Sequence, residues 1–260
     1  MKKYYVIISA IMIVSLLCAC NSSGYHYVVE NGCGYITIEH TASQSDMIGS
    51  QVEESRIRFA SYAEMVADIR DGNFTETEMK ELAEFPCNKD GRIKVLDINN
   101  VYFPVLPDGS SGEIAKIDWY GNRFELSATH PIGELFFIQI EDSSDWESFR
   151  DRRLGFSKST PIDHDVERNA TVYKWIDGSD RVRYSICFDI EINNTCVYVC
   201  ESFLNEYSGA PSQIIMFGST GTLNYIISIG DPYWVSSVPL PERPSTEFLK
   251  QITIERYIGE

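Results

Sequence analysis

Residues 187–200 read CFDIEINNTCVYVC, and they decide the fold because two strongly β-forming runs meet at an Asn-Asn pair. Apolar and polar side chains alternate on both sides of Asn193 and Asn194, which is the period of a β-strand. Asparagine tolerates the left-handed backbone conformation that a two-residue hairpin turn requires. We therefore predict an antiparallel hairpin in which Ile192 faces Thr195.

Counting outward from that turn places Cys187 directly opposite Cys200. The same face carries the more polar side chains of the hairpin, and the opposite face is the predicted core side. Three interpretations fit the cysteines: a disulfide between Cys187 and Cys200, buried free thiols beneath a helix, or a redox or metal site that includes Cys196. The disulfide requires a pair without backbone hydrogen bonds, and a register slip of one residue would separate the two side chains.

The same two-residue period continues outside this hairpin. Turn-forming combinations such as DG, GSSG, GN and PIG separate the runs, which is typical of consecutive antiparallel strands. The predicted strands cover 92–98, 101–106, 113–120, 123–129, 134–141, 171–176, 181–192, 195–203, 212–217 and 222–229. Residues 155–169 are predicted to form a loop.

Helical signals occur near both ends of the mature chain. Capping boxes at Ser61–Glu64 and Thr75–Glu78 predict a helical hairpin over 61–84, and a third box at Ser144 predicts a short helix to about 154. The tail from Ser245 to about Tyr257 also begins as a helix. The expected class is α+β, a mostly antiparallel twisted sheet flanked by an N-terminal helical hairpin and a C-terminal helix.

We expect residues 25–260 to form one domain, preceded by a signal peptide at 1–19 and a short tether at 20–24. A weak internal likeness links IDWYGNRFELS with YKWIDGSDRVRYS, each with a tryptophan before a glycine-containing turn. It raises an internal duplication around 90–140 and 170–230 as an alternative.

The chain is strongly acidic, with a net charge of −16 over 260 residues. Removal of residues 1–19 takes away two lysines and no acidic residue, so the mature charge is −18. This balance repels phosphate groups and excludes nucleic acid as an expected partner. A cationic ligand is compatible with it, as is a purely solubilising role of the acids.

The N-terminus gives the clearest indication of where the protein is located. Lys2 and Lys3 precede an uncharged stretch over 4–19 whose end forms, with Cys20, the sequence LCAC at 17–20, which is the layout of a secretory signal. LCAC resembles the lipobox of bacterial lipoproteins. The resemblance implies that Cys20 receives a diacylglyceryl group and anchors the chain to a bacterial cell membrane on its extracytoplasmic face. The alternative is a retained membrane helix, for which 4–19 is short.

Few residues suggest a site. Tyr233 and Trp234, in the sequence GDPYW, are the best candidates for an exposed platform that stacks against a ligand. The run Asp163–Asp165 holds the only tight cluster of a histidine with carboxylates, but alternate residues of an extended chain point apart, so we expect a solvated loop. No catalytic residue, metal site or cofactor is predicted, because none of the corresponding motifs is present.

The expected function is therefore that of a membrane-anchored, extracytoplasmic domain that binds a ligand or an envelope partner without catalysis. The partner would be an envelope protein, a glycan or a cationic ligand. The alternative is an anchored hydrolase of cell-wall or glycan substrates that uses carboxylates such as Glu141, Asp142 and Asp145. A structural module of a larger envelope complex is a third reading.

Overall fold

The computed structural model describes residues 25–31, 33–38, 57–59, 61–82, 92–119, 123–141, 146–154, 159–221, 223–230 and 238–258. Of these, 54% lie in strands and 17% in helices. The protein is mostly β, so the expected α+β class is wrong. No helix among the described residues combines the length and hydropathy of a membrane span.

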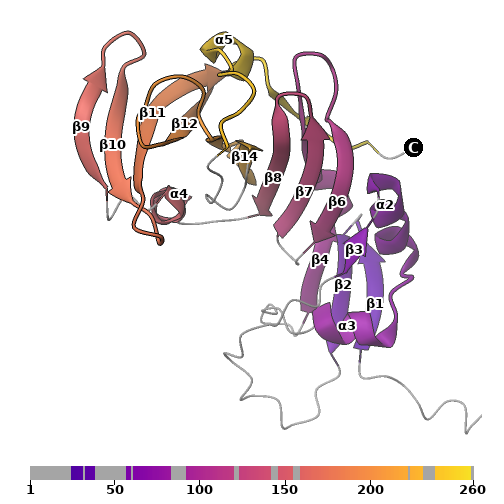
Figure 1. Cartoon of the computed structure of the whole chain (residues 1–260). Helices are drawn as coiled ribbons and strands as arrows, with labels where there is room; N and C mark the ends of the chain where they lie inside the picture. The colour runs from indigo at the N-terminus through magenta and orange to yellow at the C-terminus, as the bar shows by residue number, and fades with distance from the viewer. Residues whose placement is uncertain are drawn as a thin grey trace, which may run out of the picture.

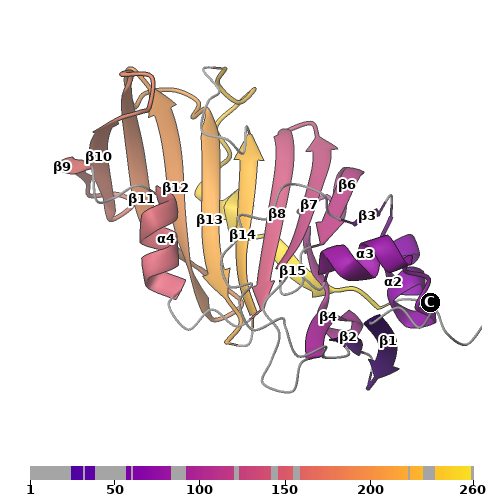
Figure 2. The same ribbon diagram turned by 90° about the horizontal axis from the view of Figure 1, so that it is seen from below.

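A ten-stranded antiparallel sheet forms the body of the molecule (Figures 1 and 2). Its strands follow the order β3-β6-β7-β8-β14-β13-β12-β11-β10-β9, so β3 and β9 are the edges. In that order they span Arg58–Phe59, Glu113–Trp119, Arg123–His130, Gly133–Glu141, Leu223–Gly230, Gln213–Ser219, Thr195–Leu204, Val182–Ile192, Ala170–Ile176 and Thr160–Asp165. Most neighbours are also consecutive in the sequence, as tight turns dictate.

The hairpin of β11 and β12 has the predicted register. Ile192 faces Thr195, and Cys187 faces Cys200. Asn193 and Asn194 have φ values of 50° and 62°, which both central residues of a type I′ turn need. The local chemistry of the Asn-Asn pair therefore fixes the alignment of the two longest strands.

The two faces of the large sheet are covered differently. Phe188, Val197 and Val199 belong to the main core, as the alternation predicted, and the C-terminal segment packs there too, with Leu249 fully buried. The other face carries α4 (Trp146–Leu154). Figure 2 shows α4 in front of the sheet, with the yellow C-terminal segment behind it.

Two smaller sheets complete the fold. One has the order β1-β2-β4, with strands Tyr25–Glu30, Cys33–Ile38 and Arg92–Asp97, and the 3-10 helix η1 (Ile98–Asn100) follows β4. The other pairs β5 (Tyr102–Val105) with β15 (Thr253–Arg256). Gln139 on β8 fastens β5 to the large sheet, because its amide accepts from the Tyr102 backbone at 2.9 Å and donates to the Asn100 carbonyl at 2.6 Å.

The expected N-terminal helical hairpin is wrong. Short helices α2 (Tyr62–Asp71) and α3 (Glu76–Leu82) occur, and Ser61 and Thr75 cap their first turns. However, α2 lies against β3 and α3 against β1, so they do not form a paired layer over the sheet. Gly72 ends α2 in the left-handed conformation, with φ of 70°, and the chain changes direction there.

The C-terminal helix is also shorter than expected. Helix α5 spans only Thr246–Leu249, and β15 follows it. Pairing with β5, about 150 residues earlier, overrides the helical pattern of the tail. The prediction of a loop over 155–169 is also wrong in part, because this range contains β9. Both faces of β9 are exposed, so its polar sequence lacks the alternation that identifies a strand.

The two tryptophan hairpins that suggested a duplication differ in orientation. Trp119 is buried in the main core, whereas Trp175 donates to Ser185 on the face that carries α4. The single domain and the duplication both stay predictions.

Candidate functional site

Cys187 and Cys200 meet on the face of the sheet that carries α4. Their sulfur atoms are 3.0 Å apart, and both are free thiols with exposed fractions of 4% and 1%. Pairs in an antiparallel ladder alternate, and counting from the hydrogen-bonded pair Ile192–Thr195 makes Cys187–Cys200 a non-hydrogen-bonded pair. This is the arrangement that the predicted disulfide requires. The disulfide itself stays a prediction.

Helix α4 covers the two thiols. Leu154 is buried with them in one apolar cluster, and the ring of Trp146 lies 6.0 Å from that of Phe217. The guanidinium of Arg150 lies 4.7 Å above the ring of Tyr198, which belongs to the same cluster. The two cysteines therefore lie close together beneath a helix.

Burial controls the chemistry of these thiols. It raises the pKa of Cys187 well above the usual value, because the thiolate loses solvation, and the contact with Cys200 acts in the same direction. Cys196 is an exposed residue on the same face. The pKa of its thiol is also raised, first by partial loss of solvation and then by the negative charge of Asp189. Neither thiol has the low pKa of a catalytic nucleophile.

A row of buried polar side chains lies beside the cysteines. Ser185, Ser202 and Gln213 occupy facing positions on β11, β12 and β13. The Gln213 amide donates to Ser228 at 2.9 Å. The hydroxyl of Ser202 and the amide oxygen of Gln213 have no hydrogen-bond partner within the described part of the chain. These polar side chains border the apolar cluster that lies beneath α4.

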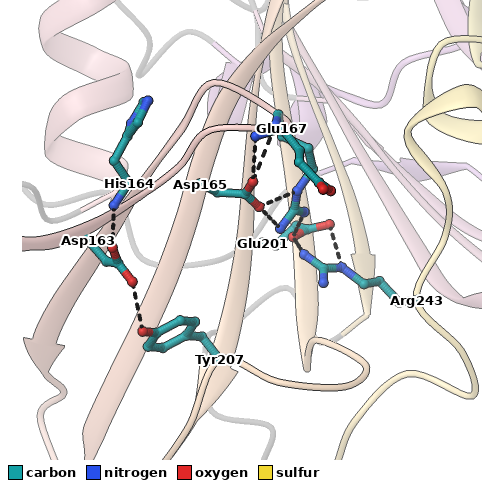
Figure 3. A network of polar contacts seen from close by, with 8 residues as sticks. Asp163, His164, Asp165, Glu167, Glu201, Tyr207 and Arg243 are labelled. Atoms are coloured by element: carbon teal, nitrogen blue, oxygen red, sulfur yellow. Dashed lines mark hydrogen bonds and ion pairs between the residues drawn. The ribbon is translucent and has the colours of Figure 1, made fainter.

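A buried carboxylate dominates the opposite face (Figure 3). Glu201 on β12 is 2% exposed, and it accepts hydrogen bonds from Arg168 at 3.0 Å and from Arg243 Nε at 3.1 Å. A second nitrogen of Arg243 also bonds this carboxylate, so that contact is bidentate. Because Arg168 follows β9 and Arg243 precedes α5, one charge joins three separate segments.

The network continues to the turn after β9. Arg168 Nε donates to Asp165 at 2.8 Å, and this hydrogen bond holds the pKa of Asp165 below its usual value. Asp163 instead accepts from the Tyr207 hydroxyl at 3.2 Å, as Figure 3 shows. The two aspartates of the 163–165 run therefore serve different partners and do not converge on a common ligand.

These ion pairs decide what the network can do chemically. Both oxygens of the Glu201 carboxylate already accept hydrogen bonds from guanidinium groups, so neither is presented to a substrate. The network holds two carboxylates and two guanidinium groups, so its charges balance. They belong to Asp165, Arg168, Glu201 and Arg243. We conclude that the network fixes the turn after β9 and the C-terminal segment to the sheet.

Several predicted site residues cannot be placed. Cys20, Tyr233 and Trp234 lie outside the described residues, so lipidation and the stacking platform stay predictions. Within the described ranges, no group of three or more histidine, cysteine or acidic side chains is arranged to hold a metal ion.

Sequence reasoning missed Glu201 and its two arginines. The available signal was one acidic residue within a strand whose other members are mostly apolar, TCVYVCESFL. A charge in such a place is expected to be paired. The partners lie 33 and 42 residues away, and no local pattern identifies them.

Comparison of the chain with protein-family models, with curated proteins and with solved structures finds no match.

Proposed function

We propose that this protein is a bacterial lipoprotein, anchored through Cys20 on the extracytoplasmic face of the cell membrane, and that its β body binds an envelope partner without catalysis. The lipobox-like LCAC supports the anchor. The observation that carries the binding role is the open edge of the large sheet at β9.

Strand β9 offers backbone groups to a partner, except at Pro161, which has no N–H, and at His164, whose N–H already donates to the Asp163 carboxylate. It pairs with β10 on one side, and in the described part of the chain no strand lies on the other. Residues 160–164 are all exposed. Open edges of this kind bind extended segments of other proteins by strand addition, in which backbone hydrogen bonds supply affinity.

Side chains at this edge indicate the chemistry of the partner. Ile162 is 46% exposed, and Val166, in the turn after β9, is 82% exposed. Exposed carboxylates of Asp163 and Glu167 lie between and beside them. A strand with apolar residues and with lysine or arginine would complement both features, since opposite charges on facing strands stabilise the pair. We therefore propose an extended cationic segment of an envelope protein as the partner.

Photo-crosslinking in cells tests this role. A photoreactive residue in place of Ile162 should give one discrete adduct with an envelope protein. The matched control is Ile176, which is 60% exposed but lies on β10, and it should give none. The Asp163→Lys substitution should weaken the adduct, whereas the same charge change at Glu113, exposed on β6, should not.

Two results would refute the proposed edge. Adducts of equal yield at positions 162 and 176 would show that contact is unspecific. An adduct that Asp163→Lys leaves unchanged would exclude a cationic partner at β9.

A further inference from the structure

We propose that Cys187 and Cys200 form a disulfide in the mature protein and that α4 then shields this bond from reductants. The two thiols thus make a modification site whose accessibility is controlled by one helix. The inference uses the proposed extracytoplasmic location only as the source of oxidising conditions.

The geometry needs little change to close the bond. Facing residues of a non-hydrogen-bonded pair have Cβ atoms about 4.5–5.5 Å apart, close to the range of disulfides. The sulfur atoms, at 3.0 Å, must approach by about 1 Å to reach bonding distance. Both cysteines lie within the ladder of ten residue pairs between β11 and β12, so neither strand needs to change register.

The other described cysteines face acidic residues across their ladders, not Cys187 or Cys200. Cys196 faces Glu191 across the same ladder, and Cys33 lies on β2 in a different sheet, where it faces Asp97. Pairing with either would require β11 or β12 to leave its register. Cys187 is therefore matched to Cys200 by the topology as well as by distance.

Formation of the bond requires an external disulfide as oxidant. The thiolate of one cysteine attacks the oxidant RSSR, which forms a mixed disulfide and releases one RS⁻. The second thiolate then attacks the protein sulfur of the mixed disulfide and expels the second RS⁻. Overall the protein loses two protons and two electrons, and RSSR becomes two RSH.

Both steps need access that the seated helix denies. The thiols are almost fully buried, and Leu154 of α4 packs in their cluster. Oxidation therefore takes place before α4 seats or while it is displaced, and reduction of the finished bond needs the same displacement. Closing this short loop should raise the melting temperature by about 5–10 °C.

The bond is tested on the full chain, purified in mild detergent, unfolded in urea and refolded with glutathione disulfide, so that oxidation can take place before α4 seats. After denaturation and alkylation without reductant, peptide mapping should find residues 187 and 200 linked. Cys196→Ser should keep the link, and Cys187→Ser should lose it. Absence of this linked peptide, or a link through Cys196, would overturn the inference.

The gate is tested by the rate at which a small reductant opens the bond. Leu154→Ala should speed reduction at least about 10-fold, because it weakens the seating of α4. Leu249→Ala removes another buried leucine side chain, from the opposite face, and should have a much smaller effect. Equal acceleration by both would show that reduction follows global unfolding, which contradicts gating by α4.

A second experiment distinguishes this inference from the proposed location. The same peptide mapping is applied to protein whose thiols are blocked with an alkylating agent inside the cells. A link that forms with glutathione disulfide but is absent from cells would count against the extracytoplasmic location and not against the pairing. Failure in both experiments would overturn the pairing itself.

Discussion

Replacement of Glu201 by glutamine should destabilise the fold strongly. The substitution keeps the shape of the side chain but removes the charge that joins β12 to Arg168 and Arg243. Arg168 retains Asp165, whereas for Arg243 the structure gives no other carboxylate partner among the described residues. The main loss therefore falls on the C-terminal segment.

The size of the effect follows from burial. Removal of one partner of a fully buried ion pair costs about 3–5 kcal/mol. Here the carboxylate is 2% exposed, but the side chains of Arg168 and Arg243 are 24% and 30% exposed, so water screens part of the loss. We expect a decrease of about 2–3 kcal/mol in the free energy of unfolding, which corresponds to about 5–10 °C in melting temperature.

Urea unfolding of the full chain in mild detergent measures this value. The unfolding midpoint should fall with the slope unchanged, since the same surface is exposed on unfolding. Glu206→Gln is the matched control: it makes the same chemical change at an exposed position five residues later and should stay within about 0.5 kcal/mol of the wild type.

A double-mutant cycle with Arg243→Gln tests the assigned partner. The double variant should cost less than the sum of the single variants by about 1 kcal/mol or more. Additive costs, or an E201Q protein as stable as the control, would refute the claim that this charge ties the C-terminal segment to the sheet.

Three further predictions concern acid, the hairpin turn and a glycine. The hydrogen bond from Arg168 lowers the pKa of Asp165 below 3.8, so its contribution to stability is present above about pH 4 and is lost as the pH falls through the lowered value. Unfolding measured at pH 5 and below pH 3 should differ less in Asp165→Asn than in the wild type. Asn194→Ala should cost about 1 kcal/mol by urea unfolding because φ is 62°, and Asn194→Gly should cost less. Gly218→Ala would place a Cβ 2.2 Å from the buried ring of Tyr225, so the melting temperature should drop by about 5 °C or more.

The sequence predicted those features that short-range chemistry controls. The Asn193–Asn194 turn and the alternation around it were sufficient for the register that places Cys187 opposite Cys200. Capping at Ser61 and at Thr75 likewise marked where two helices begin. In each case the signal and the structure lie within a few residues of one another.

Features that depend on distant segments were not predictable in this way. The tail 253–256 became a strand because β5 was available to pair with it, although its local pattern was helical. Strand β9 has no buried face, so it lacks the alternation that identifies a strand. The partners of Glu201 come from segments that only the folded sheet brings together.

The most direct test of the account is the intact mass of the full-length protein purified from bacterial membranes. We predict a chain that begins at Cys20 and carries a diacylglyceryl group on that sulfur. A chain that retains residues 1–19, or that has an unmodified cysteine at position 20, would contradict the lipid anchor and the proposed function built on it.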